Sequence, residues 1–406
     1  MGEKAGKAGI GKVTPVRSTG DFTIVTLQLE TTPQERRATG AKSASRKTKP
    51  TKRFEPICLL PGPVALAESV KAAFAEPIVY HRGEEFLPLF QRVRSNLSAI
   101  VGGKPSAVLV GSGTLANDAV GATLAAEKDS EGLVLVSGEF GERLLKQARR
   151  WNLNLRVLQW DWGQPWNLGE VETALKQMGP NRWVWGVHHE TSTGVINDLP
   201  RLVTLASSLG HRVCVDCVSS IGTVDVDLSG VYLASGTSGK AIGSYAGLAF
   251  IFGQPTEIAQ FQAKPVPDYL DVAAALSATG PRFTVPSPLV RSLDVALEPM
   301  ATSQRRQARF ARIAKLGKHL RTCLRNIGCE PLSRDDIANP SIVTFAPPPG
   351  RSAAEFVTHC RNLGYLIAGQ SGYLAERNLV QIAVMGDVGR EHIDGLFTAL
   401  AGESRP

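Results

Sequence analysis

The sequence predicts an α/β protein in which a mostly parallel central sheet is flanked by helices and followed by a smaller C-terminal α+β domain. Between about residues 106 and 218, apolar runs of strand length alternate with stretches that repeat hydrophobic residues at helical spacing. The runs are AVLV, LVLVS, LRVLQW, WVWGVHH and VCVDCV. Such alternation favours parallel strands covered by helices on both faces. With 406 residues, the chain is long enough for two or three structural units.

The segments on either side of this alternation complete the predicted order of elements. A tight Pro-Gly-Pro turn at Cys58 to Val64 comes first, because proline fixes φ and glycine frees it. Helices are predicted from Glu68 to Ala75 and from His81 to about Val101, where hydrophobic residues recur at helical spacing. After Pro288 the composition changes, and a long basic helix is predicted from Leu293 to Arg325, followed by shorter elements.

Three regions are predicted along the chain: a basic tail over 1–53, a large domain over 54–290 and a small domain over 291–406. The tail holds twelve Lys and Arg against four Asp and Glu, so it accounts for the whole net charge of +8. Its Ser, Thr and Lys content without hydrophobic periodicity predicts disorder, apart from a short strand at Asp21 to Leu29. The favoured interpretation is a solvated extension without a nucleic-acid partner. The alternatives are contact with nucleic acid or an anionic surface, or an organellar targeting peptide.

Location and cysteine usage point to the inside of the cell. No apolar run approaches the ~20 residues that a membrane span needs, and the first residues lack the apolar core of a secretory signal. We therefore expect a cytoplasmic protein whose six cysteines are free thiols. Cys214 and Cys217 form a C-x-x-C, but they lie in a predicted buried strand and no second pair completes a zinc site, so no metal is expected.

One lysine stands out because of where it lies. Two apolar runs, Val231 to Ala234 and Gly247 to Phe252, indicate buried strands of one sheet, and Lys240 lies between them among glycines and serines. A buried amine without a partner is costly. An aldehyde would remove the problem by forming a Schiff base with it. The alternative is a surface lysine on a flexible loop.

Three further groups follow the carboxyl ends of predicted parallel strands, where ligands of such sheets gather. Gly111 to Thr114 lies between a strand and a helix, as in a phosphate cradle, although a tight turn would look the same. Asp216 ends an apolar strand, where it needs a cation such as a protonated pyridine, or else caps a neighbouring element. Phe140 could stack on a planar cofactor, although a core role is common for phenylalanine.

The segment His188 to Gly194 adds a dense set of donors and acceptors at a fourth strand end. The two adjacent histidines on a strand point to opposite faces, so they cannot share one metal ion. Thr191 and Ser192 could hydrogen-bond a ring hydroxyl. These groups together indicate a pyridoxal phosphate site, because each can bind one functional group of that cofactor. They are the phosphate cradle, the aromatic platform, the buried carboxylate and the single lysine.

These motifs resemble those of the class V aminotransferases, which belong to the fold-type I group of pyridoxal phosphate enzymes, over about residues 59 to 400. The matching segments are LLPGPV, GSGTLAND, GEFGER, VHHETSTGVIN, VDCVSSIG and GPRFTVPSP. Within the family, the sequence is most similar to 2-aminoethylphosphonate:pyruvate aminotransferases, followed by alanine:glyoxylate and serine:glyoxylate aminotransferases. The resemblance implies a homodimer in which GPRFTVPSP reaches the partner's cofactor phosphate.

The resemblance also implies roles for single residues. Lys240 would form the Schiff base with pyridoxal 5'-phosphate and move the substrate proton, and Asp216 would keep the pyridine nitrogen protonated. Phe140 would stack on the ring and Thr191 would bond near its hydroxyl. The remaining cofactor residues implied are Ser112, Gly113, Thr114 and Ser238, with Thr284 contributed by the other subunit.

The substrate residues depart from the family pattern. Relatives carry an arginine that pairs with the substrate's anionic group, and this sequence has Gln381 there, which can hydrogen-bond an anion but cannot neutralise it. Arg82, Arg282 or Arg377 would supply the missing charge, or the substrate lacks that anion. Pro61 and Gly62 are further candidates for substrate contact.

The sequence therefore predicts an aminotransferase that moves an amino group from a small amino acid or aminophosphonate-like donor to a 2-oxo acid of the pyruvate or glyoxylate type. Gln381 motivates an alternative, a pyridoxal phosphate lyase or desulfurase-like enzyme on the same scaffold. A second alternative keeps the fold without catalysis and uses the basic tail to contact nucleic acid. The presence of both Lys240 and Asp216 argues against that loss of catalysis.

Overall fold

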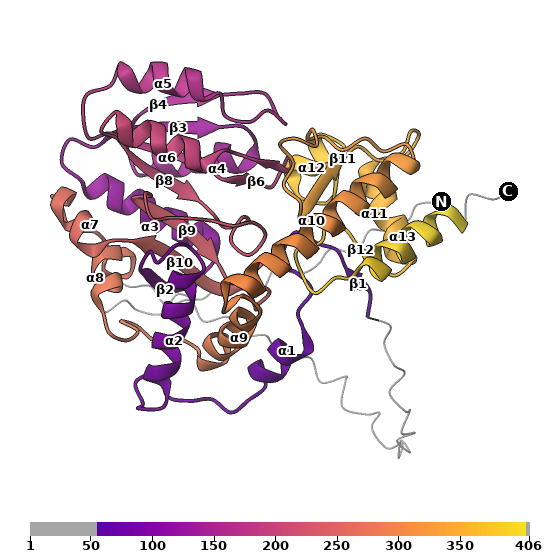
Figure 1. Cartoon of the computed structure of the whole chain (residues 1–406), viewed down its shortest axis with the longest axis horizontal. Coiled ribbons are helices and arrows are strands. Elements are labelled where there is room, and N and C mark those ends of the chain that lie inside the picture. Colours follow the sequence, from indigo (N-terminus) through magenta and orange to yellow (C-terminus); the bar gives the residue numbers. More distant parts are fainter. Residues whose placement is uncertain (1–54, 403–406) are drawn as a thin grey trace, which may run out of the picture. The chain divides into compact units, whose positions relative to one another are not determined.

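The computed structural model describes residues 55–402 (Figure 1). The predictions made for the basic tail, including the strand at Asp21 to Leu29, lie outside the described residues. Within them, no helix combines the length and apolar character that crossing a membrane requires.

A seven-stranded sheet forms the centre of the fold, in the order β2-β10-β9-β8-β5-β3-β4. The pairs between β9, β8, β5, β3 and β4 are parallel, and only β10 runs against its neighbours. This confirms the predicted mostly parallel sheet. The strands are β2 (Ser106–Gly111), β3 (Glu131–Val136), β4 (Asn154–Gln159), β5 (Trp183–Val187), β8 (Arg212–Asp216), β9 (Leu233–Thr237) and β10 (Gly247–Gly253).

Helices cover both faces of the sheet because its inner strands are buried at nearly every position and carry apolar side chains on both faces. Val108 and Phe250 belong to the core on one face, whereas Leu109 and Ile251 belong to the core on the other, as the two-residue period of a strand requires. The first face is covered by α2 (Phe86–Ala99), α5 (Leu168–Lys176), α6 (Leu199–Ser208) and α9 (Ser287–Leu297). The second is covered by α3 (Gly113–Ala126), α4 (Glu139–Arg150), α7 (Pro255–Phe261) and α8 (Val272–Ser277).

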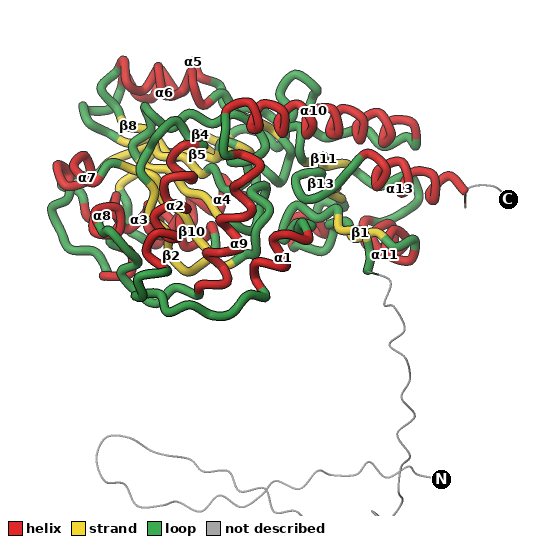
Figure 2. Tube along the Cα trace, turned by 60° about the horizontal axis from the view of Figure 1, so that its bottom comes forward, coloured by secondary structure: helices red, strands yellow, loops and turns green. Residues whose placement is uncertain are grey.

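The C-terminal segments pack around a third hydrophobic core, drawn in orange and yellow in Figure 1. The long helix α10 (Ser303–Asn326) lies along this part, as Figure 2 shows, and the first described strand, β1 (Ile57–Cys58), returns to pair with β12. The other elements are β11 (Ile342–Phe345), α11 (Ala353–Asn362), β12 (Tyr365–Leu366), α12 (Gly372–Glu376), β13 (Val380–Ala383) and α13 (Arg390–Gly402).

Shorter elements connect these layers. The helix α1 (Glu68–Phe74) corresponds to the helix predicted from Glu68 to Ala75, and it contacts α9. A two-stranded ribbon, β6 (His189–Glu190) with β7 (Val195–Ile196), follows β5 directly. Two 3₁₀ turns, Asp268–Leu270 and Glu298–Met300, complete the described elements.

Two predicted helices differ from the structure in their bounds. The helix expected from Leu293 to Arg325 is broken by the 3₁₀ turn that contains Pro299, and Thr302 caps the new start by accepting a hydrogen bond from the backbone N–H of Arg305 at 3.2 Å. The helix expected from His81 begins only at Phe86. The helix α9 packs on the central sheet and includes residue 290, after which the domain boundary is predicted. The boundary itself stays a prediction.

The direction of the strands decides where the functional residues lie. The strands β2, β3, β5, β8 and β9 all run the same way, so their carboxyl ends meet at one edge of the sheet. Lys240 lies on the connection between the antiparallel neighbours β9 and β10, as predicted. The groups predicted at the other strand ends therefore face the same edge.

Gly317 tests how α10 packs. A Cβ at this buried helical position would lie 1.9 Å from the carbonyl oxygen of Pro340. We expect Gly317→Ala to lower the free energy of unfolding by about 1–3 kcal/mol, because the backbone contact cannot relax as a side chain can. In the matched control Gly372→Ala, the new Cβ meets nothing within 4 Å, so alanine's better helix propensity should leave stability unchanged or slightly raised. Urea denaturation of both variants measures this, and equal stabilities would contradict the packing.

Candidate active site

A cleft of about 280 Å³ opens at the edge of the sheet where the strand ends meet. It brings together Lys240, Phe140 and Thr191, which the sequence predicts at three different strand ends. The complete lining is Leu60, Pro61, Gly62, Phe140, Arg143, Thr191, Lys240, Ile367, Ala368, Gly369, Gln370, Ser371, Tyr373, Leu374 and Gln381. A larger cleft of about 570 Å³ is lined by none of the predicted site residues.

Lys240 reaches the cleft with a largely buried amine. Its Nζ donates a hydrogen bond to the carbonyl oxygen of Pro61 at 2.9 Å. Burial lowers the pKa of Lys240 from 10.5 to about 8, the negative charge of Asp216 acts against this shift, and the positive charge of Arg143 adds to it. A substantial share of the amine is therefore neutral near pH 8, which is the nucleophilic form.

Gly62 permits the close approach of Lys240 to the Pro-Gly-Pro turn. A Cβ on Gly62 would lie 2.5 Å from the Nζ atom of Lys240, and the glycine has φ of +150°. A larger residue would therefore displace the amine from the Pro61 carbonyl. The turn predicted at this position thus forms one wall of the cleft.

Asp216 is held at the end of β8 by a chain of hydrogen bonds. Its carboxylate accepts from Asn117 Nδ2 at 2.7 Å and from the backbone N–H of Val218 at 2.8 Å, and Ser235 Oγ donates to Asn117 Oδ1 at 2.6 Å. Burial raises the pKa of the Asp216 carboxyl, and these bonds and the Lys240 charge oppose the rise. The carboxylate lacks a direct ion pair among the described residues, so a ligand cation would complete it.

The predicted phosphate cradle forms the start of α3. Ser112 is the N-cap residue, and Gly113 and Thr114 begin the helix. The Ser112 side chain makes no capping hydrogen bond, so the N–H groups of the first turn have no side-chain acceptor. Together with the positive end of the helix dipole, these groups can receive an anion.

Glu190 fixes the position of Phe140, and sequence reasoning missed this role. The buried carboxylate of Glu190 accepts from the backbone N–H of Phe140 at 3.2 Å and of Gly141 at 3.0 Å, which are first-turn groups of α4. It also accepts from Ser192 Oγ at 2.5 Å. Burial raises the pKa of Glu190 while these bonds lower it. The carboxylate thus anchors the helix that carries Phe140 to the segment that carries Thr191.

Thr191 belongs to a buried polar group with Ser219 and His189. Thr191 Oγ1 donates to Ser219 Oγ at 2.7 Å, and His189 Nδ1 lies 3.0 Å from the carbonyl oxygen of Ser219. Burial lowers the pKa of His189 to about 3, so its ring is neutral. Within residues 55–402, His189 Nε2 has no hydrogen-bond partner.

Gln381 lies on β13 at the wall of the cleft, and its amide is fully used. Nε2 donates to the carbonyl oxygen of Thr191 at 2.6 Å and to Thr344 Oγ1 at 2.9 Å, and Oε1 accepts from Tyr373 OH at 3.2 Å. The side chain is fully buried. Gln381 thus ties β13 to the Thr191 segment.

The other predicted site residues lie away from the cleft lining. Ser238 Oγ donates to the carbonyl oxygen of Tyr245 at 2.6 Å in the turn between β9 and β10, and Thr284 is exposed. Arg82 is exposed, and Arg377 stacks over Trp162 with Cζ 3.8 Å from the ring centroid. The roles predicted for these residues stay predictions. Arg282 is paired with Asp268.

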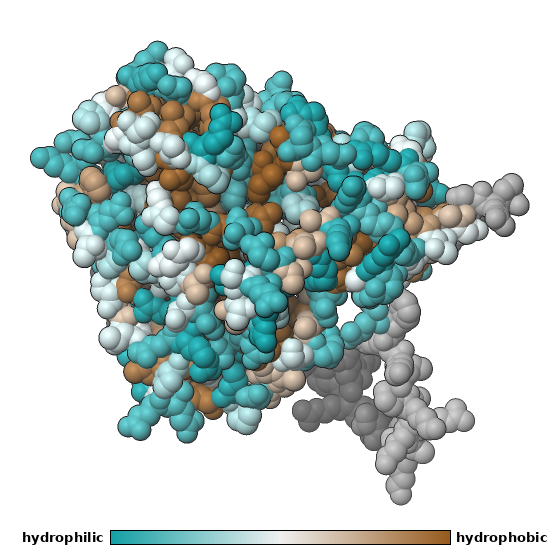
Figure 3. All heavy atoms as spheres, viewed as in Figure 1, coloured by the Kyte–Doolittle hydropathy of each residue, from teal (hydrophilic) through white to brown (hydrophobic). Residues whose placement is uncertain are grey.

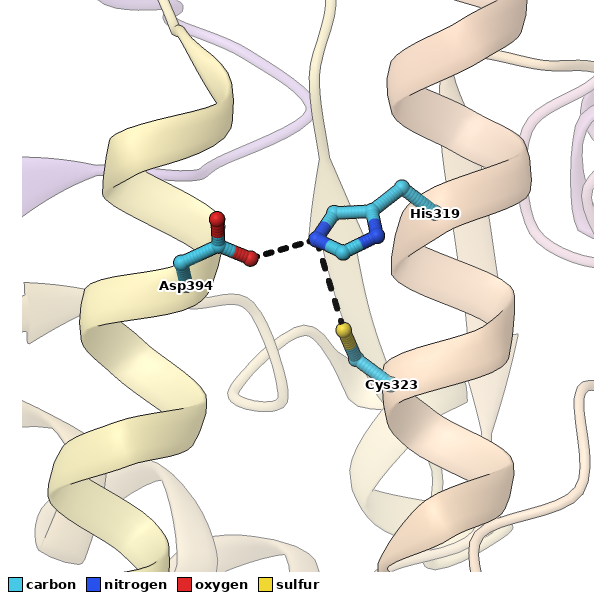
Figure 4. A group of neighbouring side chains, drawn as sticks. All are labelled: His319, Cys323 and Asp394. Atoms are coloured by element: carbon cyan, nitrogen blue, oxygen red, sulfur yellow. Dashed lines mark hydrogen bonds and ion pairs between the residues drawn. The ribbon is translucent and has the colours of Figure 1, made fainter.

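A second cluster of polar side chains joins α10 to α13 (Figure 4). His319 Nε2 lies 2.5 Å from Asp394 Oδ1 and 3.6 Å from Cys323 Sγ, and Arg390 Nε donates to Asp394 Oδ2 at 3.2 Å. One imidazole nitrogen faces both the thiol and the carboxylate, so it cannot take a proton from one while donating to the other, as a catalytic relay requires. Burial also raises the pKa of Cys323. The cluster therefore links the two helices.

The residues around the cleft fit pyridoxal 5'-phosphate. The α3 N-terminus offers uncapped N–H groups to a phosphate, the Asp216 carboxylate offers a negative charge to a protonated ring nitrogen, and Lys240 offers a partly neutral amine to a carbonyl. These three groups stand at the carboxyl ends of three strands of one sheet. Phe140 adds a flat apolar surface to the lining.

Comparisons with known proteins agree with this fit. The model of the family "Aminotransferase class-V" matches residues 67–280. The 2-aminoethylphosphonate–pyruvate transaminase of Pseudomonas fluorescens is 29% identical over 359 residues, covering 86% of this chain and 96% of that protein. The alanine–glyoxylate aminotransferase structure from Nostoc sp. has 27% identity and a TM-score of 0.79, covering 91% of this chain and 100% of that chain. An aspartate aminotransferase structure from Thermus thermophilus has 27% identity and a TM-score of 0.75, with coverages of 85% and 98%.

The lowered pKa of Lys240 gives a pH-dependent reactivity. In protein stripped of cofactor, trace acetylation of Lys240 should rise with pH, reach half of its maximum near pH 8 and level off about one unit higher, because only the neutral amine reacts. Lys71 is the internal control, since its hydrogen bond with Glu68 raises its pKa and delays its reaction to higher pH. Mass spectrometry of peptides labelled between pH 6 and 11 measures both profiles. Coincident profiles would contradict the environment described for Lys240.

Proposed function

This chain belongs to the class-V aminotransferase family and is a pyridoxal-phosphate-dependent aminotransferase, and we propose that it uses small donors with pyruvate or glyoxylate as acceptor. The donor would be a small amino acid or an aminophosphonate-like compound. The single observation that carries this function is the buried amine of Lys240, with its pKa lowered to about 8, in one cleft with a flat aromatic ring and within electrostatic reach of the Asp216 carboxylate.

The chain's own residues would divide the work between holding and proton transfer. When bound, pyridoxal phosphate supplies an electron sink for the carbon that loses its proton. Lys240 Nζ would take that proton and return it at the other position, because its pKa lies near working pH. Asp216, held by Asn117 and the Val218 N–H, would keep a positive charge on the ring nitrogen. Phe140 and Thr191 would orient the ring.

The size of the cleft supports a small donor. A volume of about 280 Å³ must hold both the cofactor ring and the reacting part of the substrate. Pyruvate and glyoxylate are small 2-oxo acids, and they appear in the names of the Pseudomonas transaminase and the Nostoc aminotransferase. The similarity to these proteins supports such an acceptor here.

A homodimer is the assembly we propose. Four of the five exposed large hydrophobic side chains among the described residues fall between positions 74 and 87: Phe74, Ile78, Tyr80 and Leu87. Figure 3 shows brown residues among polar ones at the lower edge of the view, around α2 and the segment before it. A second copy that covers this segment would remove apolar surface from water. The exposure of Thr284 leaves it available to a partner subunit.

We also propose a cytoplasmic location. All six cysteines lie in the described part of the chain and are free. Free thiols are typical of a reducing compartment.

The half-reaction tests the proposed function. Holoenzyme mixed with one donor at a time and no acceptor should convert its cofactor once, giving one equivalent of oxo product and a stoichiometric change of the cofactor's visible absorbance. The donors are 2-aminoethylphosphonate, L-alanine, L-serine, L-aspartate and L-cysteine. Lys240→Ala should abolish turnover, because no other described amine lines the cleft. Product that accumulates beyond one equivalent without acceptor would instead support the lyase alternative, and a wild-type protein that converts no donor would contradict both.

The exposed hydrophobic segment tests the dimer. Ile78 and Tyr80 are 84% and 65% exposed, so replacing both by Asp should leave the protomer folded and shift the protein to a monomer by sedimentation velocity. Leu332→Asp is the matched control, since Leu332 is an exposed hydrophobic residue outside this segment. Dimers that persist in Ile78→Asp/Tyr80→Asp, or that dissociate equally in the control, would exclude this surface.

A further inference from the structure

We propose that Arg143 binds the acid group of the amino donor and of the acceptor, and that it is the residue that selects substrates with one acid group. The inference deepens the proposed function and rests on it. It follows from the charges that face the cleft, the free donors of Arg143 and the state of Gln381.

The charges that face the cleft are the first observation. Among its fifteen lining residues, Lys240 and Arg143 carry positive side chains and none is acidic. The function proposed for Lys240 commits its amine to the cofactor. Arg143 is then the remaining cation of the lining, so an anionic group of a substrate has one charged partner there.

The side chain of Arg143 is oriented with its binding groups free. It lies one helical turn after Phe140 on α4, with Cζ 4.9 Å from the centroid of the Phe140 ring. Its Nε donates to Glu139 Oε1 at 2.8 Å, which fixes the guanidinium plane. Within residues 55–402, neither Nη atom makes a hydrogen bond. Two parallel N–H donors match the two oxygens of a carboxylate or phosphonate.

The field of Arg143 reaches the reacting centre. Its positive charge is one of the causes that lower the pKa of Lys240, so the two groups lie within electrostatic range. Glu139, the partner of Arg143, does not line the cleft. The Arg143 side chain is 49% exposed, so a substrate can approach it without displacing buried groups. An acid group held there would also neutralise part of the charge that faces Lys240.

Gln381 cannot perform this role in its present state. Both its amide nitrogen and its amide oxygen are engaged with Thr191, Thr344 and Tyr373, and the side chain is fully buried. Freeing one donor would leave a buried carbonyl oxygen unpaired, which costs about 1–3 kcal/mol. The neutral amide of Gln381 therefore holds the wall of the cleft together, and the positive charge for the substrate comes from Arg143 on α4.

The arginines first predicted for this task have other contacts or positions. Arg377 stacks on Trp162, Arg282 pairs with Asp268, and Arg82 is exposed. None of the three lines the cleft. A donor with a second acid group would therefore meet no second cation in the lining that its own protomer supplies. The substrates expected are small amino compounds with a single carboxylate or phosphonate, and a dicarboxylic donor such as L-aspartate is expected to be a poor one.

Kinetics of Arg143 variants give the first test. With the best donor from the half-reaction, Arg143→Gln should lower kcat/KM by about 10- to 100-fold, chiefly through KM, because a charge-assisted pair is lost. Arg143→Lys, which keeps the charge but not the two parallel donors, should recover part of the loss. Arg150→Gln is the matched control, an exposed arginine on the same helix outside the cleft, and should leave kcat/KM unchanged.

Ligand binding without turnover gives the second test. Propionate and methylphosphonate, titrated into the holoenzyme by calorimetry, should bind at least 10-fold more weakly to Arg143→Gln than to wild type. Neutral propionamide should bind both equally. Retention of the cofactor, measured by absorbance after gel filtration, should be unchanged, and circular dichroism should show that both variants are folded.

The outcomes separate this inference from the proposed function. Unchanged anion binding and unchanged kcat/KM in folded Arg143→Gln and Arg143→Lys would overturn the role of Arg143, even if the wild type is an active aminotransferase. Equal efficiency with L-aspartate and monoacidic donors would overturn the selectivity. If the wild type converts no donor, the proposed function fails, and the anion titration still decides whether Arg143 is the anion-binding group. If Arg143→Gln does not fold, Arg143→Lys decides the question alone.

Discussion

The constraint on which the site depends is the burial of one amine. Lys240 lies in a largely buried turn between β9 and β10, where a charged ammonium is costly, and its only hydrogen bond in the described structure goes to the Pro61 carbonyl. That bond exists because Gly62 lets the chain approach the Nζ atom. The negative charge of Asp216 partly offsets the cost of burying the ammonium, because it raises the pKa of Lys240. The lowered pKa is thus a direct consequence of packing, and it is also what makes the amine a nucleophile and a proton carrier.

Uncharged hydrogen bonds and one buried carboxylate hold the walls of the cleft. Glu190 accepts from the first turn of α4 and from Ser192, and Gln381 binds the carbonyl of the adjacent Thr191 from β13. The segment after β5 is therefore fixed from two sides, by a helix of the central layer and by a strand of the C-terminal part. A site built this way keeps its aromatic and hydroxyl groups in place without filling the cleft with charge. This leaves the few charges that face it free to act on ligands.

Local patterns were enough to predict the sheet and the position of Lys240, because each depends on residues adjacent in sequence. Pro299 indicates the break before α10, because proline interrupts a helix. The basic helical pattern that follows Pro299 nevertheless favours one continuous helix. Asn117 could not have been predicted as the partner of Asp216, because the pair joins the middle of α3 to the end of β8, and only the folded sheet brings them together. The same holds for the contact of Gln381 with Thr191. Arg143, in contrast, lies three residues after Phe140 in a predicted helix, a spacing that places both on one face.

The residues proposed for proton transfer and those proposed for substrate selectivity lie on different elements. Asp216 ends β8 and Lys240 lies on the turn between β9 and β10, and pairing within the central sheet fixes the register of these strands. The cation that faces the substrate sits on α4, and the neutral Gln381 sits on β13 in the C-terminal part. A change at either of the latter positions alters which acid groups are stabilised and leaves the proton-carrying amine and its carboxylate in place. The Nε of Arg143 already donates to Glu139, and its Nη atoms are free. Arg143 can therefore donate a pair of hydrogen bonds to one acid group and has no second pair for another. The proposed selectivity for substrates with one acid group follows from this single free pair of donors on Arg143.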